Sequence, residues 1–189
     1  MDTGNVAFES IQSKQLDKLA ELLNNDPELA DLYNQEGTSI LLYAIYHHND
    51  EAATLIRSYK TKVSIFEAAC LGDMETLDAQ LTQDPALLDA FSPDGFTLLG
   101  YTCFFGQEAL AAYLIDSGAN VDLASSNAFK VAPIHSAVAI SNINLTRLLI
   151  EQGANINARQ QGGFTALQAA VKNGSHEIER LLRQNGADQ

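Results

Sequence analysis

The sequence has few of the residues that usually indicate chemistry or secretion. Its 189 residues include no tryptophan and only two cysteines, Cys70 and Cys103, too few for a disulfide framework. It contains no apolar run of membrane-spanning length. The first residues lack the basic and hydrophobic regions of a signal peptide. We therefore expect a protein of a reducing compartment, the cytoplasm.

Basic residues are also scarce, and they are unevenly distributed. The chain has 11 Lys and Arg against 24 Asp and Glu, for a formal net charge of −13. Residues 63–129 contain no Lys or Arg but ten carboxylates. Nucleic acid and anionic membranes need clustered basic residues, so both are disfavoured as partners. The acidic stretch either serves solubility or forms a face for a basic partner protein.

No residue pattern supports catalysis, a metal or a cofactor. His47 and His48 are adjacent, and neighbours on a helix point about 100° apart, so they do not easily share one ion. Neither a phosphate-cradling glycine loop nor a Ser/His/Asp arrangement is present. Cys103 is at a core position, whereas Cys70 is at a position that can be exposed but has no basic neighbour in sequence. We predict a protein that is not an enzyme.

What the chain does have is an internal repeat. The segment Gly95–Leu99 returns at 131–135 and again at 163–167, with start points at Thr97, Ala132 and Thr165. Those starts lie 35 and 33 residues apart, and each repeat closes on Gly-Ala-Asn or Gly-Ala-Asp. A period near 33 residues is typical of a solenoid of stacked helix pairs.

A second self-match joins the first half of the chain to the middle. A shift of 58 residues places Asp26-Pro27 on Asp84-Pro85 and Tyr43 on Tyr101. Duplication of one long and one short repeat explains it most simply. Six repeats follow, near residues 5–38, 39–62, 63–96, 97–131, 132–164 and 165–189. We expect the short second repeat to lack a projecting hairpin loop.

These motifs resemble the ankyrin repeat, and the fifth repeat resembles it best. Pro133–Ala137 matches the turn that opens a repeat, and Leu148–Asn157 matches its Leu-Leu helix and Gly-Ala-Asn close. The resemblance implies an all-α solenoid of about six stacked helix pairs with hairpin-like loops, as a single domain over residues 1–189. It also implies that His135 ties neighbouring turns together by hydrogen bonds. The predicted helices are 5–12, 16–24, 40–47, 51–58, 64–71, 75–83, 98–105, 109–116, 133–140, 144–151, 166–173 and 177–184.

The terminal repeats have polar outer faces, as capping repeats do. Glu179 and Arg183 occupy positions that Thr146 and Ile150 hold one repeat earlier. We therefore expect a complete solenoid that is monomeric.

The resemblance implies that a partner protein docks on the groove made by loop tips and one edge of each first helix. That row is apolar and aromatic in its middle, where water-facing residues are expected, and Phe164 lies near a loop tip. The candidate partner-binding residues are Tyr46, Leu71, Asp94, Phe96, Phe104, Phe105, Phe129 and Ile140. In the other interpretation, neighbouring repeats close over these residues and bury them.

The leading interpretation of the function is therefore a non-catalytic adaptor that binds another protein. Two alternatives stay open. One is an acidic inhibitor or antidote that blocks a basic enzyme, and the other is a small-ligand sensor with a polar pocket between repeats.

Overall fold

The computed structural model describes residues 3–188, so residues 1–2 and 189 of the predicted domain lie outside the described part. Within residues 3–188 the fold is all-α, with twelve α-helices and isolated β-bridges in place of strands. Each predicted helix is confirmed, with boundaries that differ by two residues at most. The helices are α1 (Thr3–Gln12), α2 (Leu16–Asn25), α3 (Ile40–Tyr46), α4 (Asp50–Tyr59), α5 (Ile65–Leu71), α6 (Met74–Gln83), α7 (Leu98–Phe104), α8 (Glu108–Asp116), α9 (Pro133–Ala139), α10 (Ile143–Glu151), α11 (Ala166–Asn173) and α12 (His176–Gln184).

Local sequence explains where the helices begin. The side chains of Ser39, Thr97 and Thr165 accept the backbone N–H three residues on, at 3.2, 3.0 and 3.3 Å. Each bond satisfies one of the backbone donors that a helix N-terminus leaves unpaired. Several second helices are capped in the same way by Asn49, Asp73 and Asn142. Pro133 occupies the first turn of α9, where its missing N–H has no cost.

Three short 3-10 helices were not predicted: η1 (Pro27–Asp31), η2 (Pro85–Asp89) and η3 (Gln161–Gly163). The first two have a recognisable signal, an Asp cap followed by Pro at the first helical position. Asp26 accepts the N–H of Glu28, and Asp84 accepts the N–H of Ala86. The 58-residue self-match therefore extends to this local structure.

The described residues group into two compact units, 3–67 and 68–188, and the division falls within α5. The single domain over 1–189 stays a prediction. In the first unit α3 packs against α1, and α4 packs against α2. The fully buried side chains of Ile11, Leu19, Leu23, Ile40 and Ile56 form its core. Both helices of each pair thus contribute to one apolar layer.

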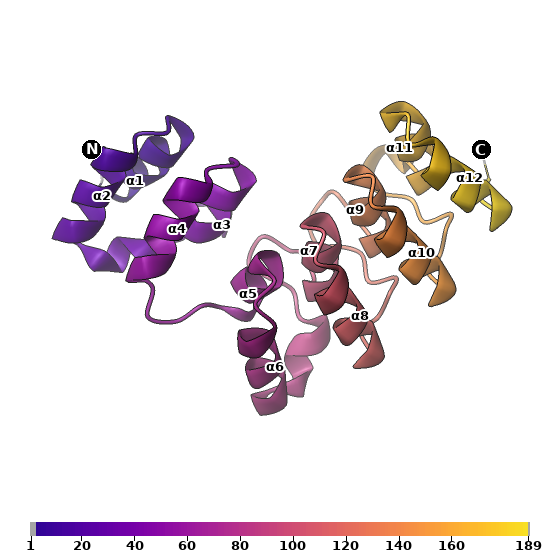
Figure 1. The fold of residues 1–189 in the computed structure, drawn as a ribbon, viewed down its shortest axis with the longest axis horizontal. Coiled ribbons are helices and arrows are strands. Elements are labelled where there is room, and N and C mark those ends of the chain that lie inside the picture. The colour runs from indigo at the N-terminus through magenta and orange to yellow at the C-terminus, as the bar shows by residue number, and fades with distance from the viewer. Residues whose placement is uncertain (1–2, 189) are drawn as a thin grey trace. The chain divides into compact units, whose positions relative to one another are not determined.

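In the second unit the first helices α7, α9 and α11 follow one another side by side (Figure 1). The second helices α8, α10 and α12 form a parallel row. The same loop contact recurs from repeat to repeat. In each case a side chain in the loop after one helix pair accepts a backbone N–H from the Gly-Ala-Asn or Gly-Ala-Asp segment that closes the next repeat. Asp89 bonds Asn120 N–H at 3.0 Å, and Asp122 bonds Asn155 N–H at 2.7 Å. Asn157 continues the series by accepting the N–H of Asp188.

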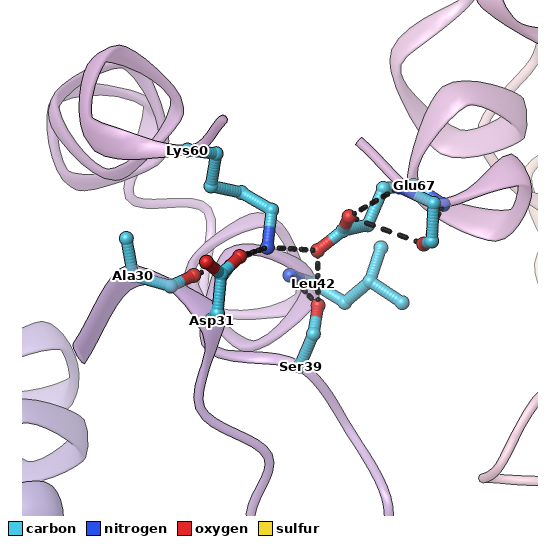
Figure 2. Close-up of polar contacts among 7 residues, drawn as sticks. Ala30, Asp31, Ser39, Leu42, Lys60 and Glu67 are labelled. Carbon is cyan, nitrogen blue, oxygen red and sulfur yellow. Dashed lines mark hydrogen bonds and ion pairs between the residues drawn. The ribbon is translucent and has the colours of Figure 1, made fainter. Parts of the chain in front are cut away.

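The short second repeat breaks that series. Only residues 60–64 separate α4 from α5, which confirms that no hairpin projects there. Asp31 is the counterpart of Asp89 in the 58-residue match, but it accepts a hydrogen bond from Lys60 Nζ, at 2.8 Å. Figure 2 shows the same ammonium group between the Ala30 carbonyl, Asp31 and Glu67. A lysine side chain thus replaces the backbone donor that the missing loop would supply.

Candidate functional site

An apolar row crosses the second unit at the C-terminal ends of its first helices. Leu71 ends α5, Phe104 ends α7, and Ile140 follows the last residue of α9. Their exposed fractions are 38%, 43% and 38%. All three were predicted from their positions in the repeat, and the structure places them at the surface. We call these three residues the first-helix row.

Side-chain amides and close packing fix the turns that carry this row. Gln107 Nε2 donates to the carbonyl of Cys70 at 3.0 Å, which ties the turn after α7 to the end of α5. Ile140 Cδ1 lies 3.5 Å from where a Cβ on Gly106 would be, so its side chain packs on the turn after α7. Asn173 Nδ2 donates to the carbonyl of Ala139 at 3.4 Å. Consecutive members of the row are thus held in register.

The two phenylalanines at the end of α7 have different environments. Phe104 is exposed, whereas Phe105 is half-buried and stacks with Tyr101 at 6.3 Å between ring centroids. Phe96 is also half-buried, with its ring 5.5 Å from that of Tyr101. Tyr101 itself is only 2% exposed. The sequence left open whether these two rings are exposed or buried. Phe104 is exposed, and Phe105 is partly buried.

Asp94 is part of a hydrogen-bonded hairpin. Its carboxylate accepts bonds from the hydroxyl groups of Tyr101 and Ser92, the latter at 2.5 Å. Its backbone carbonyl accepts Asn127 Nδ2 at 2.9 Å. The carboxylate therefore shapes the hairpin and fixes it to the next one, and its role at an acidic rim stays a prediction.

Exposed aromatic side chains also occupy the loops between helix pairs. Phe129 and Phe164 are among the most exposed large apolar residues of the described chain. The carbonyl of Phe129 accepts the N–H of Gln161 at 2.8 Å, which links these two loops. Tyr46, the remaining predicted residue, is half-buried at the end of α3 and belongs to the first unit.

Sequence reasoning missed three exposed apolar residues: Tyr33, Phe91 and Val171. Tyr33 and Phe91 occupy the same position in the 58-residue match, at the start of a hairpin that bridges to Ser39 and Thr97. The sequence signal that could have identified Tyr33 and Phe91 is an aromatic residue at the same loop position of both matching segments.

His135 has the structural role that was predicted for it. Its Nδ1 accepts the N–H of Ala132 at 3.2 Å, which leaves the proton on Nε2, and Nε2 donates to the carbonyl of Ala158 at 3.0 Å. Burial lowers the pKa of His135, although the bond to Ala158 acts in the opposite direction. The neutral ring therefore joins the start of α9 to the loop that follows α10.

Both cysteines are buried, and neither forms a disulfide within residues 3–188. Cys70 is only 4% exposed, so the expectation that it could be exposed was wrong. Its backbone carbonyl accepts a hydrogen bond from Gln107 Nε2. Burial raises the pKa of the Cys103 thiol to about 12, which disfavours the thiolate needed for nucleophilic chemistry.

Residues 3–188 contain neither a cluster of metal ligands nor a membrane-spanning helix. His, Cys, Asp and Glu side chains do not form a group of three or more that could hold a metal ion there. Across the same residues, every helix is too short or too polar to span a bilayer.

The chain matches the model of a known protein family. A protein-family model described as ankyrin repeats (3 copies) matches residues 65–160 and 99–189, which together exceed half of the chain. The chain therefore belongs to the ankyrin repeat family. Ankyrin repeats generally mediate binding to other proteins, and the family is generally non-enzymatic.

Relatives from distant sources carry the same repeats. The chain is 23% identical over 202 residues to an ankyrin repeat protein of Acanthamoeba polyphaga mimivirus, with 98% of this chain and 26% of that protein covered. It is 41% identical over 83 residues to an ankyrin repeat-containing protein of Treponema pallidum, covering 44% and 28%. Protein phosphatase 1 regulatory subunit 27 of Homo sapiens is 37% identical over 68 residues, covering 36% and 44%. The chain spans less than half the length of these curated relatives.

Proposed function

We propose that this chain is a non-catalytic adaptor that binds a partner protein through the groove side of its second unit. The first-helix row supplies the apolar contacts, and the hairpin tips with Phe129 and Asp94 border it. The observation that carries the proposal is the exposure of Leu71, Phe104 and Ile140 at the ends of consecutive first helices. Large apolar side chains that stay exposed in a folded protein often mark an interaction site.

The charge of this region favours a basic partner. Within the second unit, residues 68–129 contain no Lys or Arg and nine carboxylates. Glu75, Asp84 and Asp116 are among the exposed ones. A field of one sign increases the association rate of an oppositely charged partner and disfavours partners of like charge. The partner we propose therefore carries Lys or Arg around an apolar centre.

The experiment compares two tagged baits with the wild-type chain in an extract of the source cells. Phe104→Ala removes an exposed ring from the first-helix row. Tyr113→Ala is the control, because it removes a half-buried ring from α8, in the row of second helices. We expect one protein to be retained by the wild type and by Tyr113→Ala and to be lost with Phe104→Ala.

Calorimetry with that purified protein then gives the affinity. If Phe104 is an energetic centre of the interface, its truncation costs about 2 kcal/mol or more, which is a loss of roughly 30-fold. Equal affinities for the Phe104→Ala chain and the wild type would remove the row from the binding site. Circular dichroism must show that both variants keep their helix content.

Two further expectations belong to this proposal. The adaptor acts as a monomer, because the net charge of −13 opposes self-association. Two buried cysteines that form no disulfide in the described part of the chain fit a reducing compartment such as the cytoplasm.

A further inference from the structure

The first unit contains an open pocket of about 740 Å³ that the proposed function does not use. Its walls come from the N-terminal half of α1, from the loop around Tyr33 and Glu36, and from Tyr43 on α3. All of these residues lie within the first unit. The pocket is therefore separate from the first-helix row of the second unit.

Aromatic rings form part of the wall. Phe8 and Tyr43 pack edge to face, with ring centroids 5.0 Å apart, and Tyr43 also contacts His47. Tyr33 is 50% exposed, so part of its side chain stays accessible. An aromatic ring that keeps part of its surface free attracts a cation to its face.

The charged residues that line the pocket are both acidic. Asp26 and Glu36 line the pocket, and Lys, Arg and His are absent from its described lining. Lys60, a basic residue of the same unit, is buried and already bound to Asp31 and Glu67. Glu36 is exposed and presents its carboxylate at the surface. Two carboxylates beside three rings make a site that is complementary to a positively charged side chain.

We propose that this pocket binds an arginine side chain of a partner protein. Arginine suits the lining better than lysine does, because its planar guanidinium group stacks on aromatic rings and bonds a carboxylate through two donors. The pocket volume exceeds that of one side chain, so the residues flanking the arginine bind there as well.

The test uses the tripeptide acetyl-Gly-Arg-Gly-amide as the probe and nuclear magnetic resonance of the whole chain as the readout. We expect the probe to shift the amide signals of Phe8, Tyr43 and residues 33–37. The citrulline tripeptide has the same shape without the charge, and we expect it to bind about tenfold more weakly or not at all. The lysine tripeptide should bind with an intermediate affinity.

Two variants test the two parts of the site. Tyr33→Ala removes the exposed ring, and Glu36→Gln removes a lining charge with little change in shape. Each should weaken binding of the arginine tripeptide by about three- to fivefold. The controls are Phe91→Ala, the equivalent ring in the second unit, and Glu28→Gln, an exposed carboxylate outside the pocket lining. Both should leave the affinity within twofold of the wild-type value.

Equal binding of the arginine and citrulline tripeptides would overturn the proposal. So would shifts spread over residues 68–129, or an equal loss with Glu28→Gln and Glu36→Gln, since both would indicate general charge attraction. Phe104→Ala should not affect the tripeptide. A failure of the pocket and a failure of the proposed adaptor surface are therefore distinguishable.

Discussion

Replacing Lys60 with methionine should destabilise the first unit by about 3 kcal/mol. Methionine keeps most of the length and apolar volume of the lysine side chain but removes its ammonium group. In the folded chain the Lys60 side chain is only 3% exposed, and Nζ lies 3.1 Å from the Ala30 carbonyl, 2.8 Å from Asp31 and 3.2 Å from Glu67. Burial alone would lower the pKa of Lys60, but its hydrogen bond with Asp31 and the charge of Glu67 outweigh it and raise that pKa.

The magnitude follows from what the substitution leaves behind. Glu67 is 1% exposed, and without Lys60 its charge has no cationic partner among the contacts drawn in Figure 2. Loss of one member of a buried ion pair typically costs about 3–5 kcal/mol. We expect the lower end of that range, because Ser39 Oγ at 2.7 Å and Ser64 N–H at 2.9 Å still donate to the Glu67 carboxylate.

Urea denaturation followed by circular dichroism measures the loss, and hydrogen exchange of the α3 and α4 amides assigns it to the first unit. Lys62→Met is the matched control, because Lys62 is an exposed lysine two residues away, and its loss should change stability by less than about 0.5 kcal/mol. The double variant Lys60→Met with Glu67→Gln should regain about 1 kcal/mol or more, because no unpaired charge is then buried. Equal stability of the Lys60→Met and Lys62→Met variants would contradict the inference that the Lys60 side chain replaces the backbone donor of the missing loop.

Three further predictions concern the second unit. His135 has a lowered pKa in the folded chain, so the unfolded chain takes up the proton first as the pH falls below about 6.5. The stability advantage of the wild type over His135→Gln should therefore shrink between pH 7.5 and pH 5 in urea melts. Gly95→Ala should destabilise the fold more than Gly118→Ala does. Both glycines have a positive φ, but only a Cβ at position 95 would lie 3.0 Å from Asn127. Equal losses of melting temperature for the two variants would contradict this. Cys103 should react with iodoacetamide only in urea, and rapid labelling of the native chain would show that it is accessible.

Most of the fold could be predicted because the information lies in short, repeated patterns. The hydroxyl caps Ser39 and Thr97, the apolar spacing of the second helices and the closing glycines each determine structure within a few residues. The first two 3-10 helices, η1 and η2, have an equally local signal, and the Asp-Pro pairs at 26–27 and 84–85 would have revealed them.

The candidate site could be predicted only by position. The repeat register identifies which residues end a first helix, so Leu71, Phe104 and Ile140 could be named from the sequence. It does not determine which of two adjacent rings packs inward. Phe105 is half-buried because the Tyr101 ring stacks on it, and Tyr101 is held in turn by its bond to Asp94. Such a chain of contacts depends on tertiary structure.

The ion pair of the first unit shows how local and tertiary information combine. Ser64 and Glu67 have the Ser-x-x-Glu spacing of a capping box, and Ser64 Oγ accepts the N–H of Glu67 at 3.2 Å while Glu67 accepts the N–H of Ser64. That pattern is visible in the sequence and explains why a carboxylate lies in the first turn of α5. It does not explain why the carboxylate is buried. Burial follows from the missing loop, which brings Lys60 to the place where Asp31 would otherwise meet a backbone N–H. In the short repeat the Lys60 side chain donates to Asp31, whereas in the longer counterpart the backbone N–H of Asn120 donates to Asp89. A single substitution can remove a side-chain donor, whereas every residue except proline keeps the backbone donor, so the short repeat is the more easily destabilised of the two.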